Sequence, residues 1–576
     1  MMISNFKTLK NNLKKDISYL PAVKVALLGD TATQFLATAI KGVAVQRGLN
    51  IEMFEADYSQ VERQLLDTTS ELYEFNADYI VVFHSSHKLL STYNKLPVEK
   101  QHLLADSRLD FVSSLSKMVK SRIIYFNYPE IDDSVYGSYS NKVESSFTYQ
   151  IRKLNYQLMD ISIKNTNLFI CDVAAIQNKV GRDVMFHPAV YIGSEMVFSI
   201  DVLPYIAGRT MDIICAVEGK FKKCLILDLD NTVWGGIVGD DGYEKLELGH
   251  ELGIGKAFTE FQEWALKLKN RGIILAVCSK NNEDNAKEPF EKHPEMVLRL
   301  KDIAVFIANW ENKADNIRRI QSILNIGFDS IVFLDDNPFE RNMVRENLPD
   351  VTVPELPEDP AQYLEYLYSL NLFETATHSH TDAERTKHYQ VEAERAATQT
   401  SFANEADFLQ SLDMKSEVTP FNSFNTPRVS QLSQRSNQFN LRTVRYTEAE
   451  VELMSKDEDS HTFSFTLTDK FGDNGLICVV ILKKKDDETA FIDTWFMSCR
   501  VLKRGMENFT LNTIVEYARG KGFKNIMGEY IPTSKNSMVQ NHYTQLGFIE
   551  VDDPEHNYFN LDVDKYEKKE SYITAI

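Results

Sequence analysis

The chain has 576 residues, of which 43% are apolar and 25% charged, and this composition is typical of a globular protein with a sizeable core. Its net charge of -20 argues against a general binder of nucleic acids or anionic membranes, because such proteins need an excess of Lys and Arg. The six scattered cysteines form no CxxC pair, and the sequence has neither a run of 18 apolar residues nor an apolar signal segment, so we expect a cytoplasmic protein without zinc, disulfides or a membrane span.

Strand-like and helical stretches alternate through the first part of the chain. Apolar runs that end in polar loops occupy residues 23–30, 49–57, 77–84 and 122–129, and a helical pattern follows the first of them. The same rhythm continues through "NTNLFICDVAAI" to about residue 200. Alternation of this kind is typical of βαβ units, so we predict an α/β domain with a parallel sheet over residues 1–205.

A second alternating set begins at "CLILDLD". It continues with a helix over 255–270, the strand "GIILAVCSKN", helices within 283–300, the strand "AVFIANW", a helix over 313–325 and the strand "SIVFLDDNP". The proline-rich "VPELPEDPAQY" marks the trailing edge of this unit. We therefore predict a second α/β domain over 218–375, followed by a charged helical connector over 376–420.

The last part of the chain has a different pattern. Long strand-like runs are broken by "GDNG" and "KKDDE", which is typical of antiparallel hairpins. A helix over 505–521, the strand "NIMGEY", a helix near 536–546 and a final strand follow. The sequence thus predicts a mixed α+β domain over 421–576.

Acidic side chains gather at the expected strand ends of the middle domain. Asp228 and Asp230 end its first strand, and Asp335 and Asp336 end its last. Ligands of parallel α/β sheets bind beyond the carboxyl ends of the strands, so these side chains should share one crevice. Carboxylates at such close range repel each other unless a cation joins them, and Mg²⁺ suits oxygen ligands.

A hydroxyl and a lysine complete the set of groups that phosphoryl transfer needs. Ser279 ends the strand "GIILAVCSKN", and Lys313 opens the helix that follows "NWEN". A nucleophile, a charge clamp and an acid/base group are the parts required by this chemistry. The middle domain is therefore expected to contain a Mg²⁺-dependent site that acts on a phosphorylated small molecule.

These motifs resemble those of the haloacid dehalogenase superfamily, and "LDLDNTVWGGIVGDDG", "CSKNN" and "FLDDNP" resemble its FkbH subgroup. The resemblance implies a Rossmann-like catalytic domain with a minimal cap. It also implies roles for seven residues: Asp228 as nucleophile, Asp230 as general acid/base, Thr232 and Ser279 as holders of phosphoryl oxygens, Lys313 as charge neutraliser, and Asp228, Asp230, Asp335 and Asp336 as the Mg²⁺ site.

Two further details bear on the reaction. The superfamily's ion pumps have threonine at the position of Asp230, so an aspartate there favours a phosphatase or phosphoryl transfer over a long-lived phosphoenzyme. The intervals from Asp230 to Ser279 and from Ser279 to Lys313 are too short for a large cap domain, and we expect "WGGIVGDDG" to form a small flap.

The FkbH resemblance leaves a second function open. FkbH-type proteins transfer a glyceryl unit from 1,3-bisphosphoglycerate to an acyl carrier protein, which would be a separate partner of this chain. Such a scheme needs a thiol to hold the acyl group, and Cys278 beside Ser279 is the candidate. Neighbouring residues of a strand face opposite sides, however, so Cys278 is alternatively a core residue.

The first domain resembles SGNH-type hydrolases in its "LLGDTATQ" block. Thr31 stands where these enzymes have their serine nucleophile, and Asp183 and His187 are one residue too far apart for the usual Asp-x-x-His. We therefore expect a flavodoxin/SGNH-like domain without esterase activity.

The last domain resembles GNAT acyltransferases in "CRVLKRGMEN" and "NSMVQNHYTQLGF". The resemblance implies a site for an acyl or pantetheine group, with CoA or phosphopantetheine as cofactor and an acyltransferase as a third candidate function. Lys503 replaces a glycine of the family's phosphate loop, which puts that loop in doubt. The residues of this candidate site are Arg500, Lys503, Arg504, Gly505, Asn536 and Tyr543.

Overall fold

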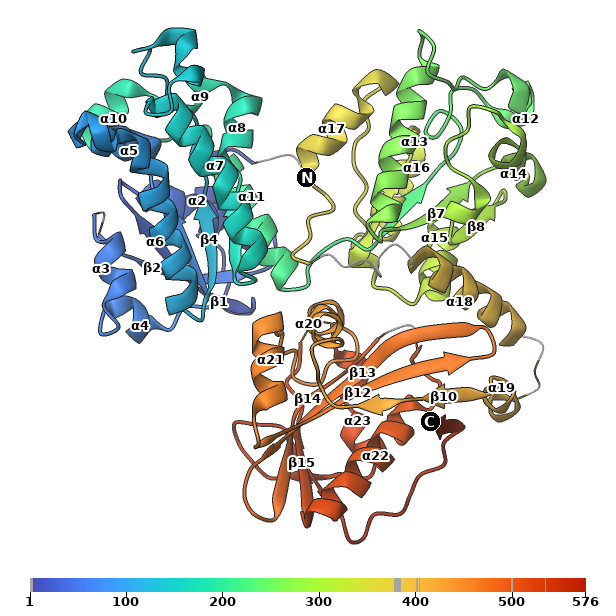
Figure 1. Ribbon diagram of the computed structural model, residues 1–576. Helices are drawn as coiled ribbons and strands as arrows, with labels where there is room; N and C mark the ends of the chain where they lie inside the picture. Colours follow the sequence, from blue (N-terminus) through green and yellow to red (C-terminus); the bar gives the residue numbers. More distant parts are fainter. Residues whose placement is uncertain are drawn as a thin grey trace. The chain divides into compact units, whose positions relative to one another are not determined.

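The computed structural model describes residues 4–57, 59–377, 385–399, 402, 404–498, 501–533 and 535–576. The chain divides into two compact units, Met1–Ala216 and Val217–Ile576. The first unit contains one sheet and the second contains two (Figure 1).

The first unit is a parallel sheet in the order β2-β1-β3-β4-β5. The strands inside the sheet are mostly apolar because helices cover both faces, as in other doubly wound sheets, whereas the edge strand β2 carries Asn50, Glu52 and Glu55. The strands are β1 Ala22–Gly29, β2 Asn50–Glu55, β3 Tyr79–Phe83, β4 Arg122–Phe126 and β5 Leu168–Cys171. The helices are α1 Phe6–Asn12, α2 Gln34–Gln46, α3 Val61–Leu66, α4 Glu71–Phe75, α5 Ser86–Lys95, α6 Leu104–Met118, α7 Phe147–Lys164, α8 Val173–Val180, α9 Arg182–Met185, α10 Pro188–Ser194 and α11 Leu203–Val217.

The second unit begins with a four-stranded parallel sheet in the order β8-β7-β6-β9. Alternate strand residues serve two separate cores: Leu225 and Leu227 pack on one face, and Cys224 and Ile226 on the other. The strands are β6 Cys224–Leu227, β7 Ile274–Ser279, β8 Val305–Ala308 and β9 Ile331–Leu334. The helices are α12 Val238–Asp241, α13 Gly255–Asn270, α14 Glu283–Lys292, α15 Lys313–Leu324, α16 Pro338–Asn347 and α17 Tyr363–Leu370.

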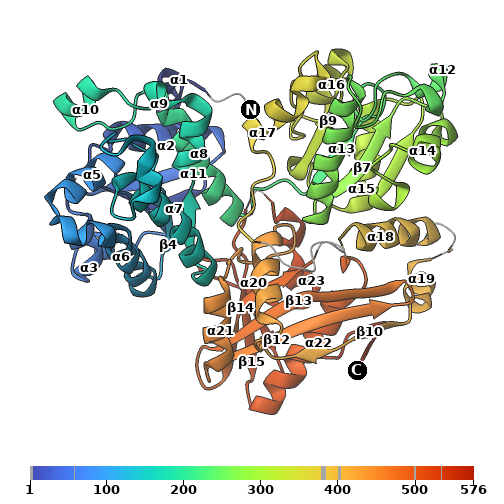
Figure 2. The same cartoon turned by 45° about the horizontal axis from the view of Figure 1, so that its top comes forward.

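The remainder of the second unit is a mixed nine-stranded sheet in the order β16-β17-β15-β14-β13-β12-β10-β18, with β11 beside β12 (Figure 2). Its strands are β10 Met414–Ser416, β11 Val418–Thr419, β12 Ser460–Asp469, β13 Gly472–Lys484, β14 Thr489–Met497, β15 Asn525–Glu529, β16 Ile549–Val551, β17 Tyr558–Asp562 and β18 Ile573–Ala575. Its helices are α19 Glu405–Ser411, α20 Thr426–Arg435, α21 Glu448–Lys456, α22 Met506–Lys521 and α23 His542–Gln545. Helix α18 Arg385–Gln399 packs instead on α15, β7 and β8 of the four-stranded sheet.

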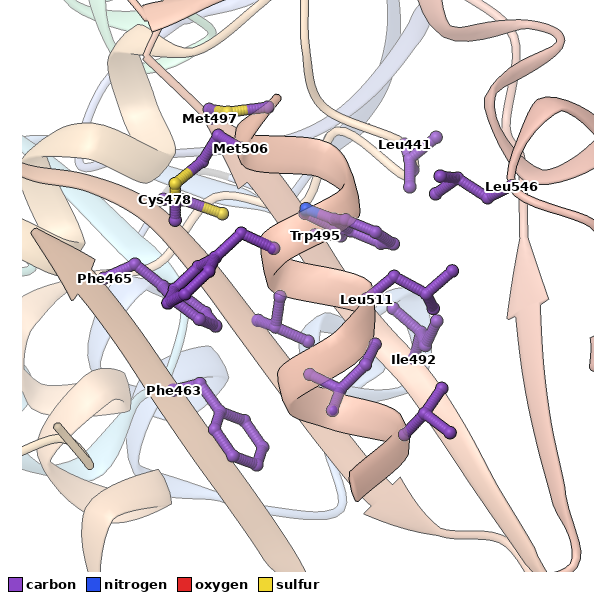
Figure 3. Packing of buried hydrophobic residues seen from close by; sticks show 14 of the residues in the cluster. Leu441, Phe463, Phe465, Cys478, Ile492, Trp495, Met497, Met506, Leu511 and Leu546 are labelled. Carbon is purple, nitrogen blue, oxygen red and sulfur yellow. The ribbon is translucent and has the colours of Figure 1, made fainter. Parts of the chain in front are cut away.

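The core of this sheet forms where α22 packs on β12, β13 and β14. Figure 3 shows Phe465, Cys478 and Trp495 from the strands beside Met506 and Leu511 from the helix. All five side chains are fully buried. Aromatic and β-branched side chains at alternate strand positions explain why this segment folds as a sheet under a helix.

Three details differ from the sequence prediction. The sheet includes β10 and β11, which lie within the segment 376–420 that we expected to be a connector. The first hairpin turns directly before Gly472, so "GDNG" lies at the start of β13 and not in the turn. The helix expected near 536–546 is reduced to a 3₁₀ turn, Ser537–Val539, and the single turn of α23. These differences fit the weakness of local signals at element ends.

The helices are short compared with the thickness of a bilayer. The longest in the described ranges is α7, which has 18 residues and carries Arg152 and Lys153 within it. Across the part of the chain that the structure describes, no helix combines the length and the apolar character that a membrane crossing requires.

Candidate active site

The centre of the candidate site is a buried ion cluster at the carboxyl ends of β6 and β9. Asp228 follows β6 directly, Asp335 follows β9, and Lys313 opens α15. The Lys313 Nζ lies 2.9 Å from Asp228 Oδ2 and 2.6 Å from Asp335 Oδ2. All three residues are buried, with 7%, 0% and 3% of Asp228, Asp335 and Lys313 exposed. The structure therefore brings together three residues that the sequence separates by up to 107 positions.

Asp336 adds a third carboxylate to the cluster. Oxygen atoms of Asp228, Asp335 and Asp336 all lie within 4.8 Å of one another, which suits a group of ligands for one cation. Lys313 supplies a single positive charge to these carboxylates. These three carboxylates lie close enough together to bind the same ion, and their oxygen atoms therefore fit a hard divalent cation.

The pKa values of the cluster reflect burial and mutual repulsion. Burial, followed by the charge of Asp228, raises the pKa of Asp335, even though Lys313 acts in the opposite direction. The same two causes raise the pKa of Asp336. Burial alone would lower the pKa of Lys313, but Asp228 and Asp335 together raise it above its ordinary value. The lysine is therefore held in its charged form.

Asp230 is fixed in place by the glycine-rich segment that follows it. Its Oδ1 accepts hydrogen bonds from Trp234 Nε1 at 2.9 Å and from the Val238 amide at 3.0 Å. Its Oδ2 accepts one from Asn281 Nδ2 at 2.8 Å. Burial raises the pKa of Asp230. "WGGIVGDDG" is thus attached at the rim of the site through the predicted acid/base residue itself.

A left-handed turn at Asn231 joins Asp230 to Thr232. Asn231 has φ 54°, a conformation that asparagine tolerates better than most residues. Its carbonyl accepts a hydrogen bond from Tyr363 of α17, at 3.1 Å. Thr232 is fully buried, and its Oγ1 accepts the Asp336 amide at 3.1 Å. Ser279, at the end of β7, is 2% exposed.

Cys278 lies in the core and not in the crevice. It is fully buried among the apolar side chains on the α15 face of the sheet, and its Sγ lies 3.7 Å from the Lys313 carbonyl. Burial raises the pKa of the Cys278 thiol, so the reactive thiolate is disfavoured. The alternation of side chains along β7 accounts for this position. The geometry gives no support to the thioester role.

Sequence reasoning missed Asn281 and a second structural support of the site, Arg341. This side chain is 3% exposed, and its Nη1 donates to the carbonyls of Asp335 at 2.9 Å and Asp336 at 2.6 Å. Its Nη2 pairs with Glu355 at 2.5 Å. The guanidinium thereby fixes the backbone that presents both carboxylates. The sequence signal that could have revealed this role is an arginine one turn into the helix that follows "DDNP".

Two of the described residues that were predicted for an acyl or pantetheine site, Arg504 and Asn536, have partners within the protein. Arg504 is 4% exposed and pairs with Asp469 and with Glu392 of α18, so it is committed to a buried ion network. Asn536 is fully buried, where it hydrogen-bonds the Asn440 and Ile531 carbonyls. These two predicted binding roles are therefore corrected to structural ones.

Of the other residues of that candidate site, Tyr543 is 1% exposed and packs against Gly528, so that a Cβ on this glycine would lie 2.3 Å from the ring. Burial raises the pKa of Tyr543, which disfavours loss of its proton. Lys503 is exposed and has φ 64°, and Gly505 caps α22 with φ 76°. Arg500 lies outside the described residues.

The chain itself fills the gap where β14 and β15 diverge. These strands pair in parallel from Thr489↔Asn525 to Ile492↔Gly528 only. Beyond that point Met497 N donates to Phe439 O at 3.0 Å, Leu441 N to Trp495 O at 3.2 Å, and Ile531 N to Leu441 O at 2.9 Å. The segment 439–441 thus takes the backbone groups that an extended ligand arm would need for strand-like pairing.

The esterase-type groups of the first unit are also not assembled. Thr31 is fully buried, and its hydroxyl has no hydrogen-bond partner within the described ranges. Asp183 in α9 and His187 before α10 are exposed. A hydroxyl nucleophile needs an adjacent base, and no base contacts the Thr31 hydroxyl in the described part of the chain.

The parallel sheet, with its acid cluster and buried lysine at the carboxyl ends of the strands, defines a phosphatase-type domain of the haloacid dehalogenase superfamily. The model of the FkbH N-terminal domain matches residues 24–215. A crystal structure of the N-terminal part of the protein BF1531 from Bacteroides fragilis, which contains a phosphatase domain and is complexed with Mg, is similar at 66% identity and a TM-score of 0.64. The match covers 65% of this chain and 100% of that chain. The protein therefore belongs to the FkbH family.

Solved N-acetyltransferases also match the chain. The ribosomal-protein-S18-alanine N-acetyltransferase from Escherichia coli is 14% identical, with 26% of this chain and 94% of that chain covered and a TM-score of 0.20. The spermidine N-acetyltransferase from Vibrio cholerae, in complex with CoA and spermine, is 13% identical, with 26% and 97% covered and a TM-score of 0.21. No curated protein matches the sequence.

Proposed function

We propose that the protein is a Mg²⁺-dependent phosphatase that acts through an aspartyl-phosphate on Asp228. The observation that carries the proposal is the position of the Lys313 ammonium between the carboxylates of Asp228 and Asp335, at the carboxyl ends of two neighbouring strands. A buried carboxylate held beside a fixed cation is suited to attack an anionic phosphorus centre, because the cation offsets the repulsion between the two.

In the proposed reaction Asp228 attacks the phosphorus of a phosphate monoester. The bond from Asp228 to phosphorus forms as the bond to the leaving oxygen breaks, and Asp230 gives its proton to that oxygen. Asp230 then takes a proton from a water molecule that attacks the aspartyl-phosphate, which releases inorganic phosphate and restores Asp228. Thr232 and Ser279 would hold phosphoryl oxygens, while Lys313 balances their charge.

Asp228, Asp335 and Asp336, together with the backbone carbonyl of Asp230, would hold Mg²⁺. The bound ion would supply charge neutralisation at the phosphoryl oxygens. The proposal is supported by the close approach of the three carboxylates and by the magnesium in the structure of the related protein from Bacteroides fragilis.

Removal of divalent metal should abolish hydrolysis of a generic phosphate ester. We expect turnover to fall at least about a hundredfold in a chelator and to recover when Mg²⁺ is added in excess, because one lysine cannot balance three clustered carboxylates and the substrate. Mg²⁺ should also raise the unfolding temperature of the wild type but not of Asp335→Asn, since a ligand of the native state stabilises it. Full turnover in metal-free buffer would contradict the metal requirement.

The glyceryl transferase remains the alternative activity, with a separate acyl carrier protein as partner. The buried position of Cys278 makes this thiol a poor acyl carrier, so we expect no adduct on it. Incubation of the full chain with 1,3-bisphosphoglycerate, followed by intact mass measurement, should give the same result for the wild type and for Cys278→Ala. A glyceryl adduct that the wild type forms and Cys278→Ala lacks would restore the thioester role.

A further inference from the structure

A cavity of about 420 Å³ lies in the second unit, away from the acid cluster. Its lining includes Lys223 and Ser330, the residues directly before β6 and β9, and the segment 435–439, which begins at the last residue of α20. The candidate active site lies at the opposite, carboxyl ends of the same two strands. The volume is within the range of pockets that hold small molecules.

Three cationic side chains from separate segments line this cavity: Lys223, Arg435 and Lys535. Lys223 donates to the Arg435 carbonyl at 3.0 Å, and Lys535 Nζ lies 2.5 Å from Asp329 Oδ2. Asp329 and Asp350 are the carboxylates of the lining, so its charge is positive overall. Burial would raise the pKa of Asp329, yet that pKa lies below its ordinary value because Lys535, Lys222 and Lys223 outweigh burial. A positive cavity stands out in a chain of net charge -20.

Ser436 contributes a hydroxyl without a partner. The residue lines the cavity and is only 5% exposed, and its Oγ has no hydrogen-bond partner in the described part of the chain. A buried hydroxyl that makes no hydrogen bond costs free energy, so such groups are normally satisfied by the protein, by water or by a ligand. Ser436 is therefore an independent sign of a polar occupant.

The remaining lining is apolar and comes from both sheets of the unit. Phe328 precedes β9, Phe439 follows α20 and Met497 ends β14. Phe439 and Met497 are buried, and their backbones are joined by a 3.0 Å hydrogen bond, so this wall is part of the core of the nine-stranded sheet. A lining that combines cations and a hydroxyl with aromatic and thioether groups matches a molecule with an anionic head and a carbon skeleton.

We propose that this cavity is a second ligand site, which binds an organic phosphate with its phosphate group toward Lys223, Arg435, Lys535 and Ser436 and its carbon skeleton toward Phe328, Phe439 and Met497. A phosphate group offers several acceptor oxygens to donors that come from different directions, whereas a carboxylate offers two in one plane. The site is separate from the phosphatase centre and does not depend on the activity proposed for it.

The test is a calorimetric titration of the full chain with phenylphosphonate, whose carbon–phosphorus bond the proposed phosphatase does not cleave. Lys535→Gln should weaken the cavity component of binding at least about tenfold, the effect of losing one charged hydrogen bond, and Ser436→Ala about fivefold. Lys524→Gln is the matched control, because Lys524 also has a carboxylate 2.5 Å from its Nζ but is exposed and remote from the lining. It should bind like the wild type.

Asp335→Asn separates the two sites. Binding to the cavity should persist in this variant, whereas any binding at the metal centre should weaken. The proposal is overturned if Asp335→Asn removes all binding, or if Lys535→Gln and Ser436→Ala both titrate like Lys524→Gln. Failure of the phosphatase proposal would show instead as absence of ester hydrolysis, which these titrations do not measure.

Discussion

Asp228→Asn is expected to lower phosphate-ester hydrolysis at least about a thousandfold, because loss of a nucleophile that works together with its neighbours removes most of the catalysis. Asparagine keeps the size of the side chain but cannot form the acyl-phosphate bond. Lys313 retains Asp335 at 2.6 Å as an ion-pair partner, so the fold should tolerate the change. Steady-state kinetics with a chromogenic ester and excess Mg²⁺ measures the effect.

Asp240→Asn provides the control for this experiment. Asp240 lies in α12, within the same glycine-rich segment that anchors Asp230, but it is exposed. The variant loses the same charge near the rim and should keep turnover within about twofold, since surface substitutions away from special contacts have small effects. If Asp228→Asn retains turnover within tenfold of the wild type, Asp228 is not the nucleophile.

The proximity of Asp228 and Asp335 could be predicted from the sequence, and parallel-sheet geometry explains why. Asp228 and Asp335 directly follow apolar strands, and carboxyl ends of neighbouring parallel strands meet at one edge, so linear order was enough to bring them together. Asn281 and Arg341 were missed because their roles depend on side-chain direction. Asn281 bonds Asp230, which follows a different strand, and no local pattern encodes that contact. Arg341 bonds carbonyls only five and six residues before it, so its position in the helix after "DDNP" is a local signal.

The C-terminal domain shows the opposite case. Hairpins and α22 were predicted from local alternation and turn residues, and β12, β13 and β14 have that arrangement. The binding role of Arg504 failed because its partner Glu392 lies 112 residues earlier. A basic residue in a phosphate-loop pattern and a basic residue buried in an ion network look alike in sequence. The two cases are distinguished only by the position of α18, which brings Glu392 to Arg504.

Asp469→Asn is expected to destabilise this domain by about 3–5 kcal/mol, the usual cost of removing one partner from a buried ion pair. Asp469 accepts hydrogen bonds from Arg395 at 3.0 and 2.7 Å, and Arg504 lies 3.2 Å from it. In the variant, Glu392 would be the one carboxylate of the network that still pairs with both arginines. Burial already lowers the pKa of Arg504, so this guanidinium is poorly compensated even in the intact network.

Urea unfolding followed by tryptophan fluorescence measures the loss, with Trp234, Trp264 and Trp310 replaced by Phe in every variant so that the signal comes from the buried Trp495. Asp469→Asn should lower the midpoint of the C-terminal transition, and Arg395→Met combined with Asp469→Asn should recover part of it, because the double change removes one charge of each sign. Glu452→Gln is the control: Glu452 pairs with Lys456 at 2.7 Å, but both side chains are exposed, so its removal should leave the midpoint unchanged. Equal midpoints for Asp469→Asn and Glu452→Gln would mean that the network does not hold α18 against the sheet.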